Sequence, residues 1–79
     1  EPDLAIAWNG LSMTLKRKGD LDGAIEAGLK IVELEPDDPL GHTNLSILYQ
    51  AKDMIQEAED EKALAMQLQL QAESDPKTG

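Results

Sequence analysis

The chain repeats itself with a period of 34 residues, and this period constrains the fold more than any other feature of the sequence. Sliding the 79-residue sequence on itself by 34 positions aligns several identical pairs and many pairs of similar apolar residues. Among the identical pairs are Leu11 and Leu45, Ser12 and Ser46, Lys18 and Lys52, and Ala24 and Ala58. A repeat of this length predicts two copies of one supersecondary unit that stack on each other.

Apolar residues at three- and four-residue spacing predict four helices within these two units. The expected helices cover residues 4–18, 21–34, 40–51 and 54–73. The apolar stripe of the first helix consists of Leu4, Ala7, Trp8, Leu11 and Leu15. Because the intervening loops are short, consecutive helices are expected to be antiparallel neighbours.

Turn-forming residues separate the expected helices. Gly19 suits a left-handed cap after the first helix, and Asp20 suits the N-cap of the second. Asp38 suits the N-cap of the third helix, and Pro39 suits its first position. Asp53 takes the place of Gly19 in the second unit, where aspartate tolerates a left-handed conformation better than most residues.

A 34-residue helix–turn–helix unit resembles the tetratricopeptide repeat. The first unit, residues 5–38, matches that family at Trp8, Leu11, Gly19, Ala24 and Pro36, with Ser12 in place of the usual glycine or alanine. The second unit, residues 39–72, retains Leu45, Ser46, Tyr49 and Ala58 but has His42 for tryptophan, Asp53 for glycine and Leu70 for proline. The resemblance implies an all-α fold, a right-handed α-solenoid of two repeats with four antiparallel helices, the last one extended. Residues 1–79 would form a single domain, with residues 74–79 as a frayed tail.

The resemblance also implies packing roles. Trp8 and Leu11 would fill the space between the paired helices, while Ser12 would let them come close. Gly28 and Lys62 stand where the family usually has a large aromatic residue. The second helix of each unit is therefore expected to pack thinly.

The stretch "GDLDGAIE", residues 19–26, has the acid–spacer–acid–glycine pattern with which a calcium loop begins. An EF-hand loop in this register would place Lys18 at its first ligand position and Leu29 at its twelfth, and neither side chain binds calcium. We therefore expect Asp20 to cap a helix and Gly23 to keep the helix pair close. The chain has no cysteine, which excludes disulfides and thiolate zinc sites. No metal and no cofactor is expected.

An enzymatic function is not expected either. His42 is the single histidine, and no serine–base–acid order accompanies it. Since His42 occupies the place of Trp8 in the second unit, it is expected to be a half-buried helix residue. The basic run at residues 16–18 suits the negative end of the first helix.

The net charge of −9 argues against a nucleic-acid partner, because binding to phosphates requires lysine and arginine. The sequence has no apolar run long enough to span a membrane and no basic leader, so we expect no membrane partner and a cytoplasmic location. The sequence does not begin with methionine, which indicates a processed form or a piece of a longer protein.

In tetratricopeptide repeats the first helix of each unit lines a concave face that holds peptides, and this resemblance implies a partner-binding surface. Its residues here would be Ile6, Asn9, Met13, Arg17, Leu40, Thr43, Asn44, Ile47 and Gln50. Only Asn44 matches the lysine- and asparagine-rich carboxylate clamp of chaperone-binding members. The four apolar residues of the set suit an apolar segment or an amphipathic helix instead. The expected function is a non-enzymatic protein–protein interaction module.

Self-assembly is the alternative function. Two repeats are fewer than the three usually needed for independent stability, so a homodimer or helix exchange between copies would supply the missing burial. The fourth helix carries apolar residues around too much of its circumference for a terminal helix. The candidate interface residues are Leu64, Met66, Leu68 and Leu70.

Overall fold

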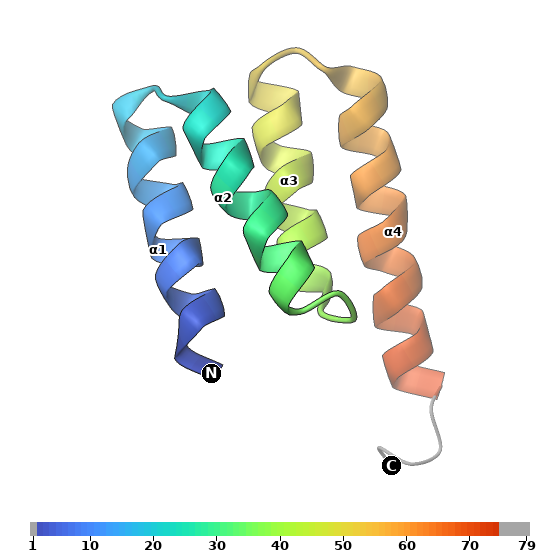
Figure 1. Ribbon diagram of the computed structural model, residues 1–79. Helices are drawn as coiled ribbons and strands as arrows, with labels where there is room; N and C mark the ends of the chain where they lie inside the picture. The colour runs from blue at the N-terminus through green and yellow to red at the C-terminus, as the bar shows by residue number, and fades with distance from the viewer. Residues whose placement is uncertain (1, 75–79) are drawn as a thin grey trace.

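The computed structural model describes residues 2–74, which form an all-α fold of four helices without strands. The helices are α1 (Pro2–Lys18), α2 (Leu21–Leu34), α3 (Pro39–Ala51) and α4 (Ile55–Ser74). Consecutive helices are antiparallel, and α1 and α4 lie at the two edges of the molecule (Figure 1). Every predicted helix is present, with its ends within two residues of the expected positions. The expected frayed tail lies outside the described residues, apart from Ser74, which ends α4.

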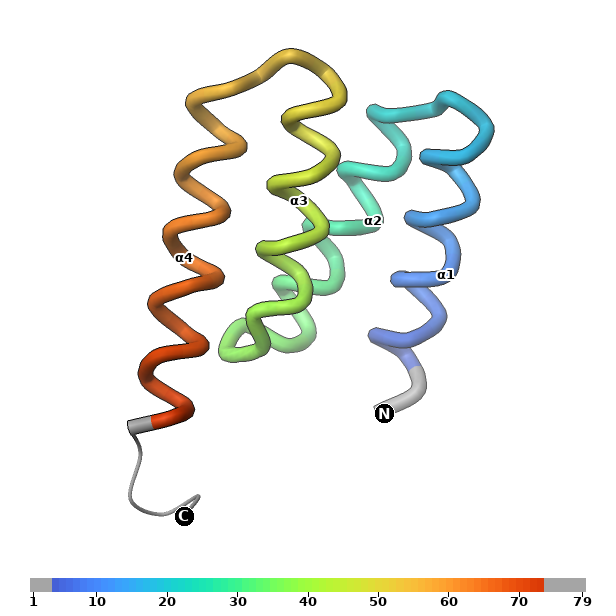
Figure 2. The backbone as a smooth tube through the Cα atoms, turned by 180° about the vertical axis from the view of Figure 1, so that it is seen from behind, coloured from blue at the N-terminus to red at the C-terminus, as the bar shows by residue number. Residues whose placement is uncertain are grey.

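The turns that close the two helix pairs have the same backbone geometry. Gly19 and Asp53 both adopt a left-handed conformation, with φ of 90° and 65°, as predicted. The amide of Gly19 donates to the Lys16 carbonyl at 3.0 Å, and the amide of Asp53 donates to the Gln50 carbonyl at 3.0 Å. The connection between α2 and α3 lies at the opposite end of the molecule (Figure 2). The 34-residue period of the sequence is therefore also a period of the turns.

Gly19→Ala is expected to lower the free energy of unfolding by about 1 kcal/mol, because a Cβ is strained at positive φ. Gly10 provides the matched control, since it lies inside α1 and a Cβ added there would meet no neighbouring heavy atom within 4 Å. Gly10→Ala is expected to raise the stability by about 0.5–1 kcal/mol through helix propensity alone. Urea unfolding followed by circular dichroism measures both changes, and equal effects of the two substitutions would contradict the left-handed turn.

Asp20 and Asp38 are the N-caps of α2 and α3, as predicted. Asp20 Oδ1 accepts a hydrogen bond from the Gly23 amide at 3.0 Å, and Asp38 Oδ1 accepts one from the Leu40 amide at 2.9 Å. A Cβ at Gly23 would lie 2.5 Å from Asp20 Oδ2. This glycine therefore makes room for the capping carboxylate.

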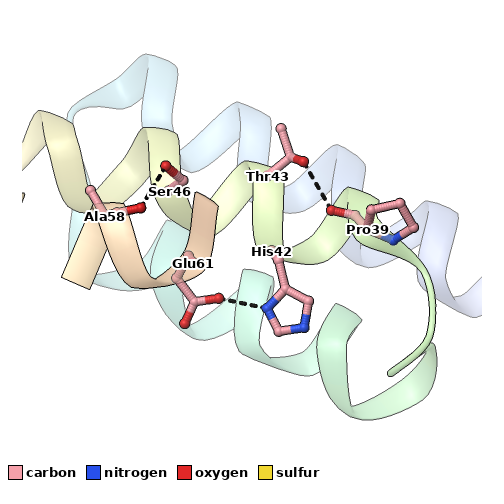
Figure 3. Close-up of polar contacts among 6 residues, drawn as sticks. All are labelled: Pro39, His42, Thr43, Ser46, Ala58 and Glu61. Carbon is pink, nitrogen blue, oxygen red and sulfur yellow. Dashed lines mark hydrogen bonds and ion pairs between the residues drawn. The ribbon is translucent and has the colours of Figure 1, made fainter. Parts of the chain in front are cut away.

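Each helix pair is held together by the same serine-to-backbone hydrogen bond. Ser12 Oγ donates to the Ala24 carbonyl at 3.0 Å, and Ser46 Oγ donates to the Ala58 carbonyl at 2.9 Å (Figure 3). Ser12 is buried, so the expected close approach of α1 and α2 at this serine is confirmed. The buried apolar residues are Ala24, Ala27, Ile31, Leu45, Leu48, Ala58 and Ala65. Alanines dominate this core, which is why the helices lie close together.

Glycines bring α2 and α3 together and join the two helix pairs. A Cβ at Gly28 would lie 2.9 Å from Leu45 Cδ2, and a Cβ at Gly41 would lie 2.8 Å from Val32 Cγ2. The expectation of thin packing is wrong at Gly28, because Leu45 occupies the space that an aromatic side chain would need. At Lys62 the side chain is exposed.

The expected role of Leu11 in filling the space between the paired helices is also wrong. Leu11 is 44% exposed, while Trp8 is half-buried. The physical reason is the position of α1, which has α2 on one side and no helix on the other (Figure 1). Leu45, the equivalent of Leu11 in the second unit, is 1% exposed, because α3 lies between α2 and α4.

Candidate functional site

A groove runs between α1 and α3, the first helices of the two pairs. Its larger part is a hollow of about 330 Å³ beside the C-terminal half of α1. The lining residues are Ser12, Met13, Lys16, Arg17, Asn44, Ile47 and Leu48. Met13 and Ile47 are 53% and 45% exposed, so this hollow presents apolar side chains to solvent.

The smaller part of the groove is a hollow of about 220 Å³ beside the N-terminal half of α1. Its lining residues are Ala5, Ile6, Asn9, Ile31, Glu35, Asp38 and Leu40. Asn44 lines the larger hollow and Asn9 lines the smaller one, and Asn44 Nδ2 donates to Asn9 Oδ1 at 2.6 Å, which links α3 to α1. We call the two hollows together the α1–α3 groove.

A separate hollow of about 230 Å³ lies between α3 and α4, and we call it the α3–α4 hollow. Its lining residues are Thr43, Ser46, Ile47, Gln50, Ala58, Glu59, Lys62 and Ala65. Thr43 and Gln50, which were predicted to belong to the binding surface, line this hollow rather than the α1–α3 groove. The other seven predicted residues line the α1–α3 groove, so the structure brings most of the predicted surface together.

The α1–α3 groove is charged at its ends, and between them its apolar side chains lie on either side of the Asn9–Asn44 hydrogen bond. Lys16 and Arg17 line one end, in the last turn of α1. Glu35 and Asp38 line the other end, at the connection between α2 and α3. The arrangement can bind an apolar segment by burial of its side chains and orient it by these charges.

His42 pairs with a carboxylate that the sequence pattern does not single out. His42 Nδ1 lies 2.6 Å from Glu61 Oε1, which links α3 to α4, and both side chains are largely shielded from solvent (Figure 3). The expected half-buried position of His42 is confirmed. The repeat offers no signal for this pair, because the positions equivalent to His42 and Glu61 in the first unit hold Trp8 and Ala27.

The polar side chains around the His42–Glu61 pair form hydrogen bonds with the backbone or lie in a partly buried, acidic environment. The hydroxyl of Thr43 donates to the Pro39 carbonyl at 2.9 Å, and that of Ser46 donates to Ala58, so both hydroxyls are bonded to backbone (Figure 3). Burial raises the pKa of the Tyr49 hydroxyl, and the negative charges of Glu61 and Glu57 raise it further. The pair therefore joins α3 to α4 in a partly shielded acidic environment.

The candidate interface residues of α4 divide into two groups. Leu64, Met66 and Leu70 are exposed, whereas Leu68 is half-buried.

Among residues 2–74, no three histidine or acidic side chains come together in a group that could hold a metal ion. None of the four helices in this part of the chain is long and apolar enough to cross a membrane.

No protein-family model, curated protein or solved structure matches this chain.

Proposed function

We propose that the protein is a non-enzymatic interaction module that binds an apolar or helical peptide segment in the α1–α3 groove. The observation that supports this proposal is the row of exposed apolar side chains along the groove. These side chains belong to two helices far apart in the sequence, yet all line one groove: Ile6, Met13, Leu40 and Ile47. Apolar side chains that gather in a groove are typical of sites that bind the apolar face of a partner helix.

The two helix pairs are proposed to be consecutive repeats of a right-handed α-solenoid that resembles the tetratricopeptide repeat. The support is the recurrence of three features at an interval of 34 residues: the left-handed turn, its closing amide hydrogen bond, and the serine-to-alanine hydrogen bond. Repeats of this kind leave the first helices of successive units side by side, and the groove lies between those helices.

The length of the groove fits a short helical segment. Ile6 and Arg17 line its two ends on α1. At a rise of about 1.5 Å per residue, the intervening part of α1 spans about 17 Å, which corresponds to about three turns of a bound helix. A segment of this length presents apolar residues at three- or four-residue spacing to Met13 and Ile47.

Substitution of the groove tests this function. A display library of random peptides is selected against the wild-type protein, and the dissociation constants of the selected peptides are measured by fluorescence anisotropy. Met13→Glu and Ile47→Glu are each expected to weaken binding by at least about tenfold, since each places a charge on the apolar contact surface. Both side chains are exposed, so we expect the helical circular dichroism spectrum to be retained.

Leu29 provides the matched control, because it is 48% exposed on α2 and does not line the groove. Leu29→Glu is expected to leave the affinity of the selected peptides unchanged. Selected peptides that bind all three variants as tightly as the wild type would contradict the proposed function.

A further inference from the structure

The 34-residue register relates two equivalent helix-packing surfaces, and among the described residues one of them is covered by another helix and the other is not. Within the chain, α3 packs on α2, with Leu45 and Leu48 against Gly28 and with Gly41 against Val32. Shifting the α2 positions by 34 places the equivalent surface on α4. The equivalents of Ala24, Gly28 and Ile31 are Ala58, Lys62 and Ala65, and these three residues line the α3–α4 hollow.

The lining residues of the α3–α4 hollow also correspond to those of the α1–α3 groove. Ser12, Met13 and Lys16 of α1 line the groove whose other wall is α3. Their equivalents Ser46, Ile47 and Gln50 line the α3–α4 hollow. No described helix forms its other wall, since α4 is the edge helix (Figure 1). The hollow is therefore the place where a helix like α3 would dock next.

The exposed side of α1 has the residues of such a docking helix. Leu11 is the equivalent of Leu45, and Ala7 is the equivalent of Gly41. Leu45 is buried against α2, whereas Leu11 is 44% exposed and Ala7 is exposed. The leucine and the small residue at these two positions are thus packed against α2 in the second unit, whereas their equivalents in the first unit are exposed.

The charges at one end of the molecule complement each other across such a contact. Within the chain, Lys52 at the end of α3 forms an ion pair with Asp22 in the first turn of α2. Its equivalent Lys18, with Lys16 and Arg17, ends α1, and these three side chains form no ion pair with another described residue. The first turns of α4 carry exposed acidic side chains: Glu57, Glu59 and Asp60. The basic end of α1 and the acidic start of α4 lie at the same end of the molecule (Figure 1).

We propose that copies of this chain associate head to tail, with α1 of one copy docked in the α3–α4 hollow of the next, where it takes the position that α3 has within the chain. Leu11 of the incoming copy faces Lys62, as Leu45 faces Gly28. Its basic end faces the acidic start of α4. The contact joins two different surfaces, so two copies do not form a closed dimer. Each assembly of copies has a free α1 at one end and a free α3–α4 hollow at the other. The proposal goes beyond peptide binding and does not rest on it.

Lys62 limits the strength of this association. Gly28 lets Leu45 approach α2 closely, and a lysine at the equivalent position must move its side chain aside when α1 docks. Lys62→Ala is therefore expected to increase the association constant by about tenfold, which corresponds to about 1.4 kcal/mol. An association constant that Lys62→Ala leaves unchanged would contradict the proposed contact of Leu11 with Lys62.

Molar mass measured by sedimentation equilibrium over a wide range of protein concentration tests the proposal. The expected result is a weight-average mass that rises with concentration beyond that of a dimer, without a plateau. Leu11→Glu is expected to reduce the mass to that of the monomer, while Leu29→Glu and Leu70→Glu leave it as in the wild type. A concentration-independent monomer overturns the proposal. A mass that reaches a plateau at twice that of the monomer also overturns the proposal, since the copies would then form a closed dimer. Loss of association in Leu70→Glu overturns it as well, since the contact would then involve the exposed face of α4.

Cysteine cross-linking tests the register, because the chain has no cysteine of its own. Leu45 Cγ lies 3.3 Å from a Cβ at Gly28, so the variant Gly28→Cys/Leu45→Cys is the control in which oxidation forms a disulfide within one chain. Leu11→Cys/Lys62→Cys is expected to give a ladder of covalent oligomers on non-reducing gels, while each single variant gives dimers at most. Absence of the ladder, when the control variant forms its disulfide, contradicts the proposed register.

Discussion

Leu45→Ala is expected to lower the free energy of unfolding by about 3 kcal/mol, a loss of transfer free energy together with the cost of the cavity left behind. Leu45 is 1% exposed and contacts the position of Gly28, so it fills the space between α2 and α3. Glycine and alanine surround much of this core and offer few atoms that can move into the cavity. A domain of this size has a total stability of roughly 4–12 kcal/mol, so the loss is a large share of the total.

Leu11→Ala is the matched control, since Leu11 is the same residue at the equivalent position of the first unit and is 44% exposed. It is expected to lower the stability by less than about 1 kcal/mol, because much of its apolar surface is already in contact with water. Urea unfolding followed by circular dichroism is measured at a protein concentration low enough to exclude association. Similar losses for the two substitutions would show that the first and second units pack alike, contrary to the structure.

The helices and their ends are predictable from the sequence because local chemistry determines them. Gly19 and Asp53 adopt positive φ, and Asp20 and Asp38 cap helices through hydrogen bonds to amides two or three residues ahead. Such interactions depend on nearby residues alone. Most of the predicted groove residues also lie together, since helical spacing places them on one side of α1 and α3.

Contacts between distant residues were less predictable. The repeat aligns Leu11 with Leu45, yet one is exposed and the other buried, because burial depends on which helices lie beside each position. The pairing of His42 with Glu61 has no equivalent in the first unit, so the period carries no information about it. Gly28 was expected to mark thin packing, and the structure shows the opposite, since Leu45 occupies the space.

Gly41→Leu is expected to lower the free energy of unfolding by about 2 kcal/mol, through overpacking between α2 and α3. A Cβ at this position would lie 2.8 Å from Val32 Cγ2, 3.2 Å from Ile31 Cγ2 and 3.3 Å from the Val32 backbone nitrogen. Both neighbouring side chains are β-branched and restricted at χ1, and the backbone nitrogen belongs to α2 itself, so none of them can move aside without shifting the helix. In the Gly41→Leu variant the two helix pairs are therefore forced apart.

Gly10→Leu makes the same substitution in α1, where a Cβ would have no neighbouring heavy atom within 4 Å. It is expected to raise the stability by about 0.5–1 kcal/mol, because leucine has the higher helix propensity. Opposite signs for one substitution at two helical glycines separate the cost of overpacking from helix propensity. If Gly41→Leu also raised the stability, α2 and α3 would be free to separate, and the α1–α3 groove would lack a fixed width. The close contact of Gly41 with α2 thus determines both the stability of the fold and the geometry of its proposed binding surface.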